Sequence, residues 1–120
     1  MDKLLKLQGA IIDLLAYYAE RFNGSNVKDV KHYVIKDTEN HHYQLISMGF
    51  RNGVFIHNCI FHFDIINEKI WLQVNNTDIL IADELIEKGI LKKNIVLGFH
   101  EPHLRQYTGF AACPDGSVVA

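Results

Sequence analysis

The chain has 120 residues, 48% of them hydrophobic, and a formal net charge of −2. This length predicts a single domain over residues 1–120 that buries a core without disulfides or a metal, and the hydrophobic content excludes a disordered chain. Because the lysines are scattered rather than clustered, tight and direct binding to nucleic acid is also disfavoured.

The first predicted element is an amphipathic helix over residues 2–22. Its apolar side chains recur at three- and four-residue steps, which is the spacing of one helix face. Asp2 can cap the first turn, and the polar segment 23–25 ends the helix. The apolar stripe consists of Leu4, Leu7, Ile11, Leu15, Tyr18 and Phe22.

A run of strands follows, because the hydrophobic pattern changes to a period of two. The four predicted strands cover residues 27–37, 41–50, 54–66 and 69–75. Turns are expected at residues 37–40, at Asn52-Gly53 and at Asn67-Glu68, and an Asn-Gly pair is a strong hairpin signal. Consecutive strands with such short links predict an antiparallel meander.

A second helix is predicted after the strands. Thr77 or Asp78 can cap its start, and the helix is expected to run to Lys88. Gly89 is typical of a helix end, and Ile90 is placed to pack back on the last turn.

The remaining segments are short. Residues 95–99 are apolar and are expected to be buried as a strand or as extended chain, and Pro102 can open a last short helix to about Tyr107. Residues 112–120 are expected to form a flexible tail. The order of elements predicts an α+β fold: an N-terminal helix, a four-stranded antiparallel meander, and C-terminal helices packed on one face of the sheet.

The third predicted strand is apolar on both of its faces, whereas a sheet with one face in water alternates more cleanly. Phe55, Cys59, Phe61, Phe63 and Ile65 are assigned to one side, and Ile56, Ile60 and Ile66 interrupt the other. We therefore expect the second face of the sheet to be covered. Since few helices are available, the cover is expected to be another subunit, which makes the chain a homo-oligomer.

His62 and Asp64 stand two apart in the third strand, so they share one face. An imidazole and a carboxylate on one face can bind a divalent metal or act as an oriented general base, and Asp37, Glu39 and His42 can join them from the neighbouring turn. The alternative is a polar network that ties the strands together or lies at a subunit interface. Because no third ligand stands at a fixed spacing, this alternative is favoured, and no metal, cofactor or catalytic residue is assigned.

Other polar and aromatic residues are candidates for an interface. Trp71 is expected in the core or at a partner contact, and Gln73 on the same packed region. His100 and His103 could share a metal, but His100 is expected instead to cap its turn or bond the backbone. Arg105 is expected to anchor the last helix or to lie at an interface.

The cysteines and the apolar segments indicate the cellular compartment of the protein. Cys59 and Cys113 are far apart, there is no CxxC motif, and the N-terminal helix carries acidic residues that a secretion signal lacks. With no apolar run long enough for a bilayer, a cytoplasmic protein without membrane contact is expected.

Several ordered motifs together resemble one known family. They are DTENHHYQL at 37–45, HFDI at 62–65, KIWLQ at 69–73, NTD at 76–78, IADEL at 81–85, NIVLGFHEP at 94–102 and RQYTGFA at 105–111. In order and spacing they resemble the XisI-like proteins, the fdxN-element excision controlling factors found largely in cyanobacteria. The chain departs from the family pattern at Asp78, Leu91 and Asn94, which are turn and cap positions.

The resemblance implies a role rather than a reaction. It implies an α+β protein without a known catalytic site, required for programmed excision of a DNA element during heterocyst differentiation. It also implies a companion, XisH, whose fold resembles restriction-endonuclease-like nucleases. The expected function is therefore that of a non-enzymatic accessory protein acting through an XisH-like partner. The alternatives are a metal-dependent hydrolase or nuclease that uses His62 and Asp64 with Glu39, and a weak DNA-binding module.

Overall fold

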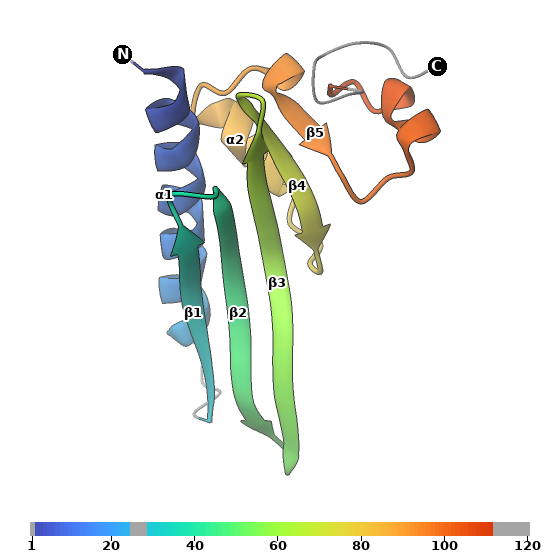
Figure 1. Cartoon of the computed structure of the whole chain (residues 1–120). Coiled ribbons are helices and arrows are strands. Elements are labelled where there is room, and N and C mark those ends of the chain that lie inside the picture. Colours follow the sequence, from blue (N-terminus) through green and yellow to red (C-terminus); the bar gives the residue numbers. More distant parts are fainter. Residues whose placement is uncertain (1, 25–28, 112–120) are drawn as a thin grey trace.

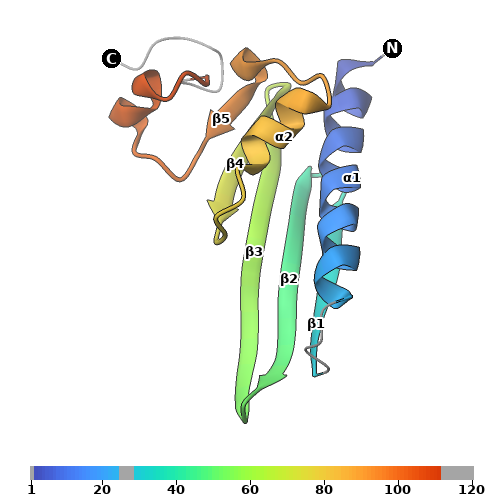
Figure 2. The same cartoon turned by 180° about the vertical axis from the view of Figure 1, so that it is seen from behind.

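A mixed sheet carries two α-helices on one of its faces, in a computed structural model that describes residues 2–24 and 29–111. Its five strands lie in the order β1-β2-β3-β4-β5. Figures 1 and 2, which view the chain from opposite sides, show α1 and α2 against the same face, here called the helix face; the opposite side is the far face. The elements are α1 (Lys3–Asn23), β1 (Val30–Asp37), β2 (His42–Arg51), β3 (Val54–Ile66), β4 (Lys69–Asn75), α2 (Ile81–Glu87), the 3-10 helix η1 (Lys92–Asn94), β5 (Ile95–Leu97) and the 3-10 helix η2 (Pro102–Tyr107).

Helix α1 forms where the apolar spacing predicted it. The carboxylate of Asp2 accepts a hydrogen bond from the backbone N–H of Leu4, which satisfies one of the free donors of the first turn. The buried side of the helix keeps four residues of the predicted stripe and adds Ala10 and Leu14, while Leu4 and Phe22 are only partly buried against the core. The buried side consists of Leu7, Ala10, Ile11, Leu14, Leu15 and Tyr18.

The two predicted tight turns between strands are confirmed. Asn52 and Gly53 have φ values of 52° and 78°, and they join β2 to β3 where Arg51 pairs with Val54. Asn67 and Glu68 have φ values of 50° and 59° and join β3 to β4. Positive φ at both central positions is the geometry whose twist matches that of the flanking strands.

The predicted antiparallel meander is confirmed for four strands, but the prediction of a purely antiparallel sheet of four strands is wrong. β1 to β4 are antiparallel as expected, but β5 joins the sheet beside β4 and runs parallel to it. A parallel neighbour requires a crossover connection, and α2 supplies it on the helix face. The apolar segment at 95–99 was therefore a strand over Ile95–Leu97, one of the two possibilities that the sequence left open.

The start of α2 also differs from the prediction. The helix begins at Ile81 after Leu80, which makes no side-chain cap. Thr77, a predicted cap, instead donates its hydroxyl to Asn75 and accepts the backbone N–H of Ile79. These local bonds hold a turn of their own and compete with helix formation.

The end of α2 agrees with the sequence. Gly89 adopts a φ of 94°, its N–H bonds to the carbonyl of Ile86, and the N–H of Ile90 bonds to the carbonyl of Leu85. Ile90 is 3% exposed and packs back on the core, as this helix ending favours.

Strand β3 contains a bulge that changes which residues share a face. Leu45 pairs with Phe61 but the next residue, Ile46, pairs with Cys59, so Ile60 has no direct partner in β2. Phe61 faces the helices, and Cys59 and Phe55 therefore lie on the far face. The prediction that Phe55 and Cys59 line up with Phe61 was wrong, because an unbroken period of two does not hold across a bulge.

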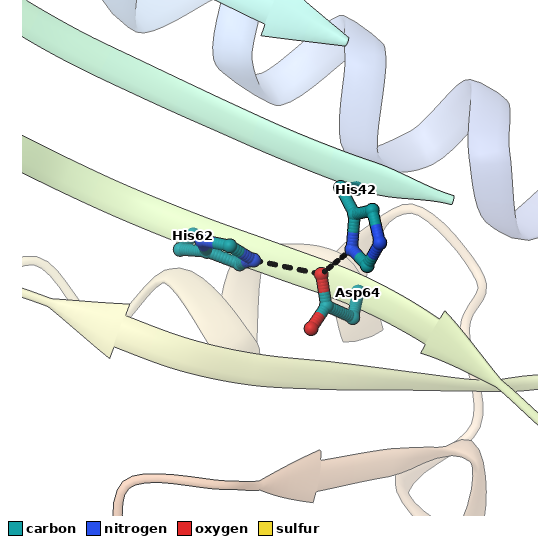
Figure 3. A group of neighbouring side chains, drawn as sticks. All are labelled: His42, His62 and Asp64. Carbon is teal, nitrogen blue, oxygen red and sulfur yellow. Dashed lines mark hydrogen bonds and ion pairs between the residues drawn. The ribbon is translucent and has the colours of Figure 1, made fainter. Parts of the chain in front are cut away.

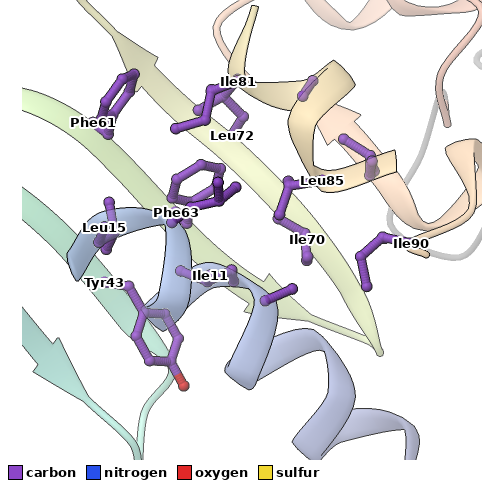
Figure 4. Packing of buried hydrophobic residues seen from close by; sticks show 14 of the residues in the cluster. Ile11, Leu15, Tyr43, Phe61, Phe63, Ile70, Leu72, Ile81, Leu85 and Ile90 are labelled. Atoms are coloured by element: carbon purple, nitrogen blue, oxygen red, sulfur yellow. The ribbon is translucent and has the colours of Figure 1, made fainter. Parts of the chain in front are cut away.

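The core lies between the helices and the helix face of the sheet. Figure 4 shows side chains from α1, α2 and the central strands interdigitating there. The largest fully buried side chains are Tyr43, Phe61, Phe63, Leu7, Ile11, Leu15, Leu45, Ile70, Leu72, Ile81, Leu85 and Ile95. Burying a side chain of this size contributes roughly 1.5–3 kcal/mol, so this layer is the main source of stability.

The flexible tail predicted at 112–120 and the first two residues of the strand predicted at 27–37 lie outside the residues that the structure describes. Within residues 2–24 and 29–111, none of the helices has the length and apolar content needed to cross a membrane.

Candidate functional site

Two histidines and one carboxylate meet on the far face. The Nδ1 atom of His42 and the Nε2 atom of His62 each lie 2.7 Å from Oδ1 of Asp64 (Figure 3). Among the described residues, these three form the only group of His, Cys, Asp or Glu with three ligand atoms gathered closely enough to hold a metal ion. They are called the His-Asp-His cluster below.

The strand register creates the cluster. His42 of β2 is the direct partner of Asp64 in β3, and His62 lies two residues before Asp64 on the same face. The neighbouring residues of the opposite face, Tyr43 and Phe63, are 0% exposed in the core. Core packing on the helix face of the sheet therefore fixes the backbone that carries the cluster.

The cluster keeps a negative charge next to two imidazoles. The hydrogen bond to Asp64 raises the pKa of His42. Burial acts to raise the pKa of the Asp64 carboxyl, but the hydrogen bonds from His42 and His62 outweigh it, and the pKa lies below its ordinary value. Such an arrangement can orient a base or bind a cation.

Gln73 supports the cluster from β4. Its Nε2 donates to Oδ2 of Asp64 at 3.3 Å, which leaves Oδ1 to the histidines. A Cβ added to Gly98 would lie 2.3 Å from Oε1 of Gln73 and 3.0 Å from the Trp71 ring, so only glycine fits there without displacing Gln73. The sequence did not point to Gly98, because the close approach depends on the β4–β5 pairing.

Trp71 is buried beside the cluster rather than exposed. It is 8% exposed, pairs with Asp64 across the strands, and contacts Val96 and Ala111. The Arg105 guanidinium lies 4.9 Å from its ring centroid. The Trp71 Nε1 atom is buried without a hydrogen-bond partner among the described residues.

Arg105 holds the C-terminal segment against this region. Its Nε donates to the carbonyl of His100 and its Nη2 to the carbonyl of Gly98. His100 thus contributes its backbone, and its ring lies against Phe99 at 4.6 Å between centroids. Neither residue joins the His-Asp-His cluster.

Glu39 and Asp37 do not join the cluster either. Glu39 is exposed in the β1–β2 turn, and its backbone N–H bonds to Oδ1 of Asp37. The Asp37 carboxylate also accepts the backbone and side-chain N–H groups of Asn40, so it closes the turn. The hydrolase hypothesis with Glu39 as a third residue has no geometric support.

A group of exposed apolar side chains occupies the other end of the far face. They come from β1, β2 and β3, and the rings of Phe50 and Phe55 lie 5.2 Å apart in an edge contact. This apolar patch consists of Tyr33 (42% exposed), Met48 (37%), Phe50 (55%) and Phe55 (56%). The apolar excess of the third predicted strand indicated that the second sheet face carries apolar residues. The sequence did not identify which residues of that strand lie there, because the bulge changes the face of those that precede it.

Together, the element order and the mixed sheet with helices on one face define the chain as a small α+β protein of two layers. The chain matches the model of the XisI protein family over residues 1–112, and it belongs to that family. The resemblance drawn from the ordered motifs is thereby confirmed.

Two solved structures are similar to this one. A XisI-like protein from Anabaena variabilis ATCC 29413 is 41% identical with a TM-score of 0.85, over 92% of this chain and 99% of that chain. The fdxN element excision controlling factor XisI from the same organism is 30% identical with a TM-score of 0.80, over 93% of this chain and 100% of that chain. Among curated proteins, none matches.

Proposed function

We propose that this chain is a non-enzymatic accessory protein of DNA-element excision that acts in the cytoplasm through protein partners. The observation that carries the proposal is its similarity, over nearly its whole length, to a structure described as an excision controlling factor. A controlling factor acts on the component that performs the chemistry, so its working surface is a contact surface rather than a catalytic pocket.

The apolar patch supports a protein contact. Four large apolar side chains between 37% and 56% exposed lie together on one sheet face. Single exposed apolar residues are normal, but a contiguous group of them marks an interaction site. Aromatic residues and methionine are enriched at the centres of protein interfaces, and the patch contains three aromatic rings and Met48.

The β2–β3 hairpin presents the patch to a partner. Figures 1 and 2 show this hairpin reaching beyond the end of α1, so the patch is accessible from the far face and from the hairpin tip. The exposed cations and anions around it, Lys31 and Asp29, give it a polar rim. An apolar centre with a polar rim is the usual composition of an interface.

The proposed partner is an XisH-like companion, with a second copy of the chain as a further partner. The test is capture of a purified XisH-like protein by the immobilised chain. We expect a stoichiometric complex, and no complex at micromolar concentrations of both proteins would remove the companion from the proposal.

Light scattering of the isolated chain tests the second copy. A homo-oligomer has a mass that is a multiple of 13.8 kDa, and its formation depends on concentration. A mass of one chain throughout the micromolar range would remove self-association while leaving the companion untouched.

A further inference from the structure

We propose that the His-Asp-His cluster binds one divalent transition-metal ion, with zinc as the best fit. The ligands would be Nδ1 of His42, Nε2 of His62 and Oδ1 of Asp64. This inference concerns a binding site and stands independently of the proposed function.

The ligand types match a zinc-like ion. Imidazole nitrogen and carboxylate oxygen are both common zinc ligands, and imidazole also suits copper, iron and nickel. Calcium and magnesium are poor candidates, because they take oxygen ligands almost exclusively and two of these three atoms are nitrogen. The charge agrees as well, since Asp64 supplies one negative charge that two neutral imidazoles do not cancel.

The geometry needs only a small adjustment. An ion bound at about 2.1 Å in tetrahedral geometry separates its ligand atoms by about 3.4 Å. The two nitrogens lie 2.7 Å from Oδ1, and all three ligand atoms lie within 4.8 Å of one another. Each imidazole would move away from the carboxylate by under about 1 Å to admit the ion.

The exposure of the three side chains allows the imidazoles to make this small movement away from Asp64. The His42 side chain is 53% exposed, whereas those of His62 and Asp64 are 23% and 14% exposed. His42 can therefore swing freely on its strand, whereas the more buried His62 needs only the same small shift away from Asp64. Figure 3 shows His42 projecting from β2 towards Asp64 on β3, so the ion would link the two strands.

Gln73 would serve as an outer partner of the ion. By donating to Oδ2 of Asp64 at 3.3 Å, it fixes the carboxylate with Oδ1 towards the histidines. Outer partners of this kind orient a metal ligand, and their loss typically weakens metal binding about 10- to 100-fold. Because the chain supplies three ligands, a fourth position would be taken by water on the exposed side.

The experiment is calorimetric titration of the tag-free chain with zinc chloride, followed by the visible spectrum of the cobalt-substituted protein. We expect one ion per chain and the absorption bands of four-coordinate cobalt. His42→Ala changes an exposed residue and should fold normally, yet it should weaken zinc binding more than about tenfold. Asp64→Asn should do the same, with folding checked by circular dichroism.

His57→Ala is the matched control. His57 is exposed on the same face of β3 and lies outside the cluster, so its loss should leave zinc binding unchanged. The proposal is overturned if the native chain binds less than one zinc ion, or if His57→Ala weakens binding as much as His42→Ala. It is also overturned if the cobalt spectrum remains that of the ion in water.

Discussion

One buried tyrosine forms a hydrogen bond between the two α-helices. The Tyr18 hydroxyl of α1 donates to both carboxylate oxygens of Glu84 in α2, at 2.5 and 2.7 Å. Burial, and then the hydrogen bond to Glu84, raises the pKa of this hydroxyl, so it stays protonated and remains a donor. Tyr18→Phe removes the donor and keeps the ring, which also packs against Phe61 and Phe22.

The expected loss follows from the charge on the acceptor. A hydrogen bond to a charged group contributes roughly 1.5–3 kcal/mol when buried. Glu84 is only half-buried, so water replaces part of the lost bond, and we expect Tyr18→Phe to lower the free energy of unfolding by about 1–2 kcal/mol. For 120 residues, each kcal/mol corresponds to about 4 °C in Tm, which predicts a drop of about 4–8 °C.

Urea and thermal unfolding followed by circular dichroism measure this loss. Tyr17→Phe is the control, because Tyr17 is 53% exposed and its hydroxyl accepts a long, exposed hydrogen bond of 3.5 Å from Arg21. The substitution keeps the Tyr17 ring, which makes an edge contact with Tyr18. It should change stability by less than about 0.5 kcal/mol. If the two variants unfold at the same urea concentration, the Tyr18–Glu84 bond does not stabilise the helix pair and the reasoning is wrong.

Three further outcomes are expected. Gly98→Ala should lower the free energy of unfolding in urea by about 1–2 kcal/mol, because the added Cβ displaces Gln73. Most of this loss should disappear when Gln73 is also replaced by alanine, and equal losses with and without Gln73→Ala would refute the clash. Glu68→Gly should stabilise the chain by about 0.5–1 kcal/mol, because it relieves a φ of 59° in a non-glycine residue, and a loss of stability would contradict the strain. The isolated chain should not retard duplex DNA in a low-salt gel, where charge attraction is strongest; retardation would restore the DNA-binding alternative.

The elements that the sequence predicted well are those fixed by neighbouring residues. Asp2 and Gly89 delimit helices through local hydrogen bonds, and Asn52-Gly53 and Asn67-Glu68 turn the chain through their own backbone geometry. Such signals are complete within a few residues, so one sequence carries them in full.

The features that the sequence missed depend on distant contacts. The β5 strand is too short to be distinguished from extended chain, and only its pairing with β4 defines it. The bulge at Ile60 follows from the β2–β3 register, and it moved Phe55 and Cys59 to the far face. A periodic pattern read along one strand cannot contain that information.

Part of the candidate site could also be predicted from the sequence, and part required the strand pairing. His62 and Asp64 share a strand, so the sequence placed them on one face, but the choice among Asp37, Glu39 and His42 as a third member required the register. The register puts His42 opposite Asp64. Gln73 and Gly98 act through the β3–β4–β5 pairings, which tie the C-terminal segment to the cluster.

The contact role of the far face has one direct test, the binding of a purified XisH-like protein to three forms of the chain. Phe55→Lys places a charge in the apolar patch, where Phe55 is 56% exposed, and Leu5→Lys places the same charge on the outer side of α1, where Leu5 is 59% exposed. We predict that the native chain and Leu5→Lys bind equally and that Phe55→Lys binds at least about tenfold more weakly. Equal binding by all three forms, or no binding by the native chain, would contradict the account.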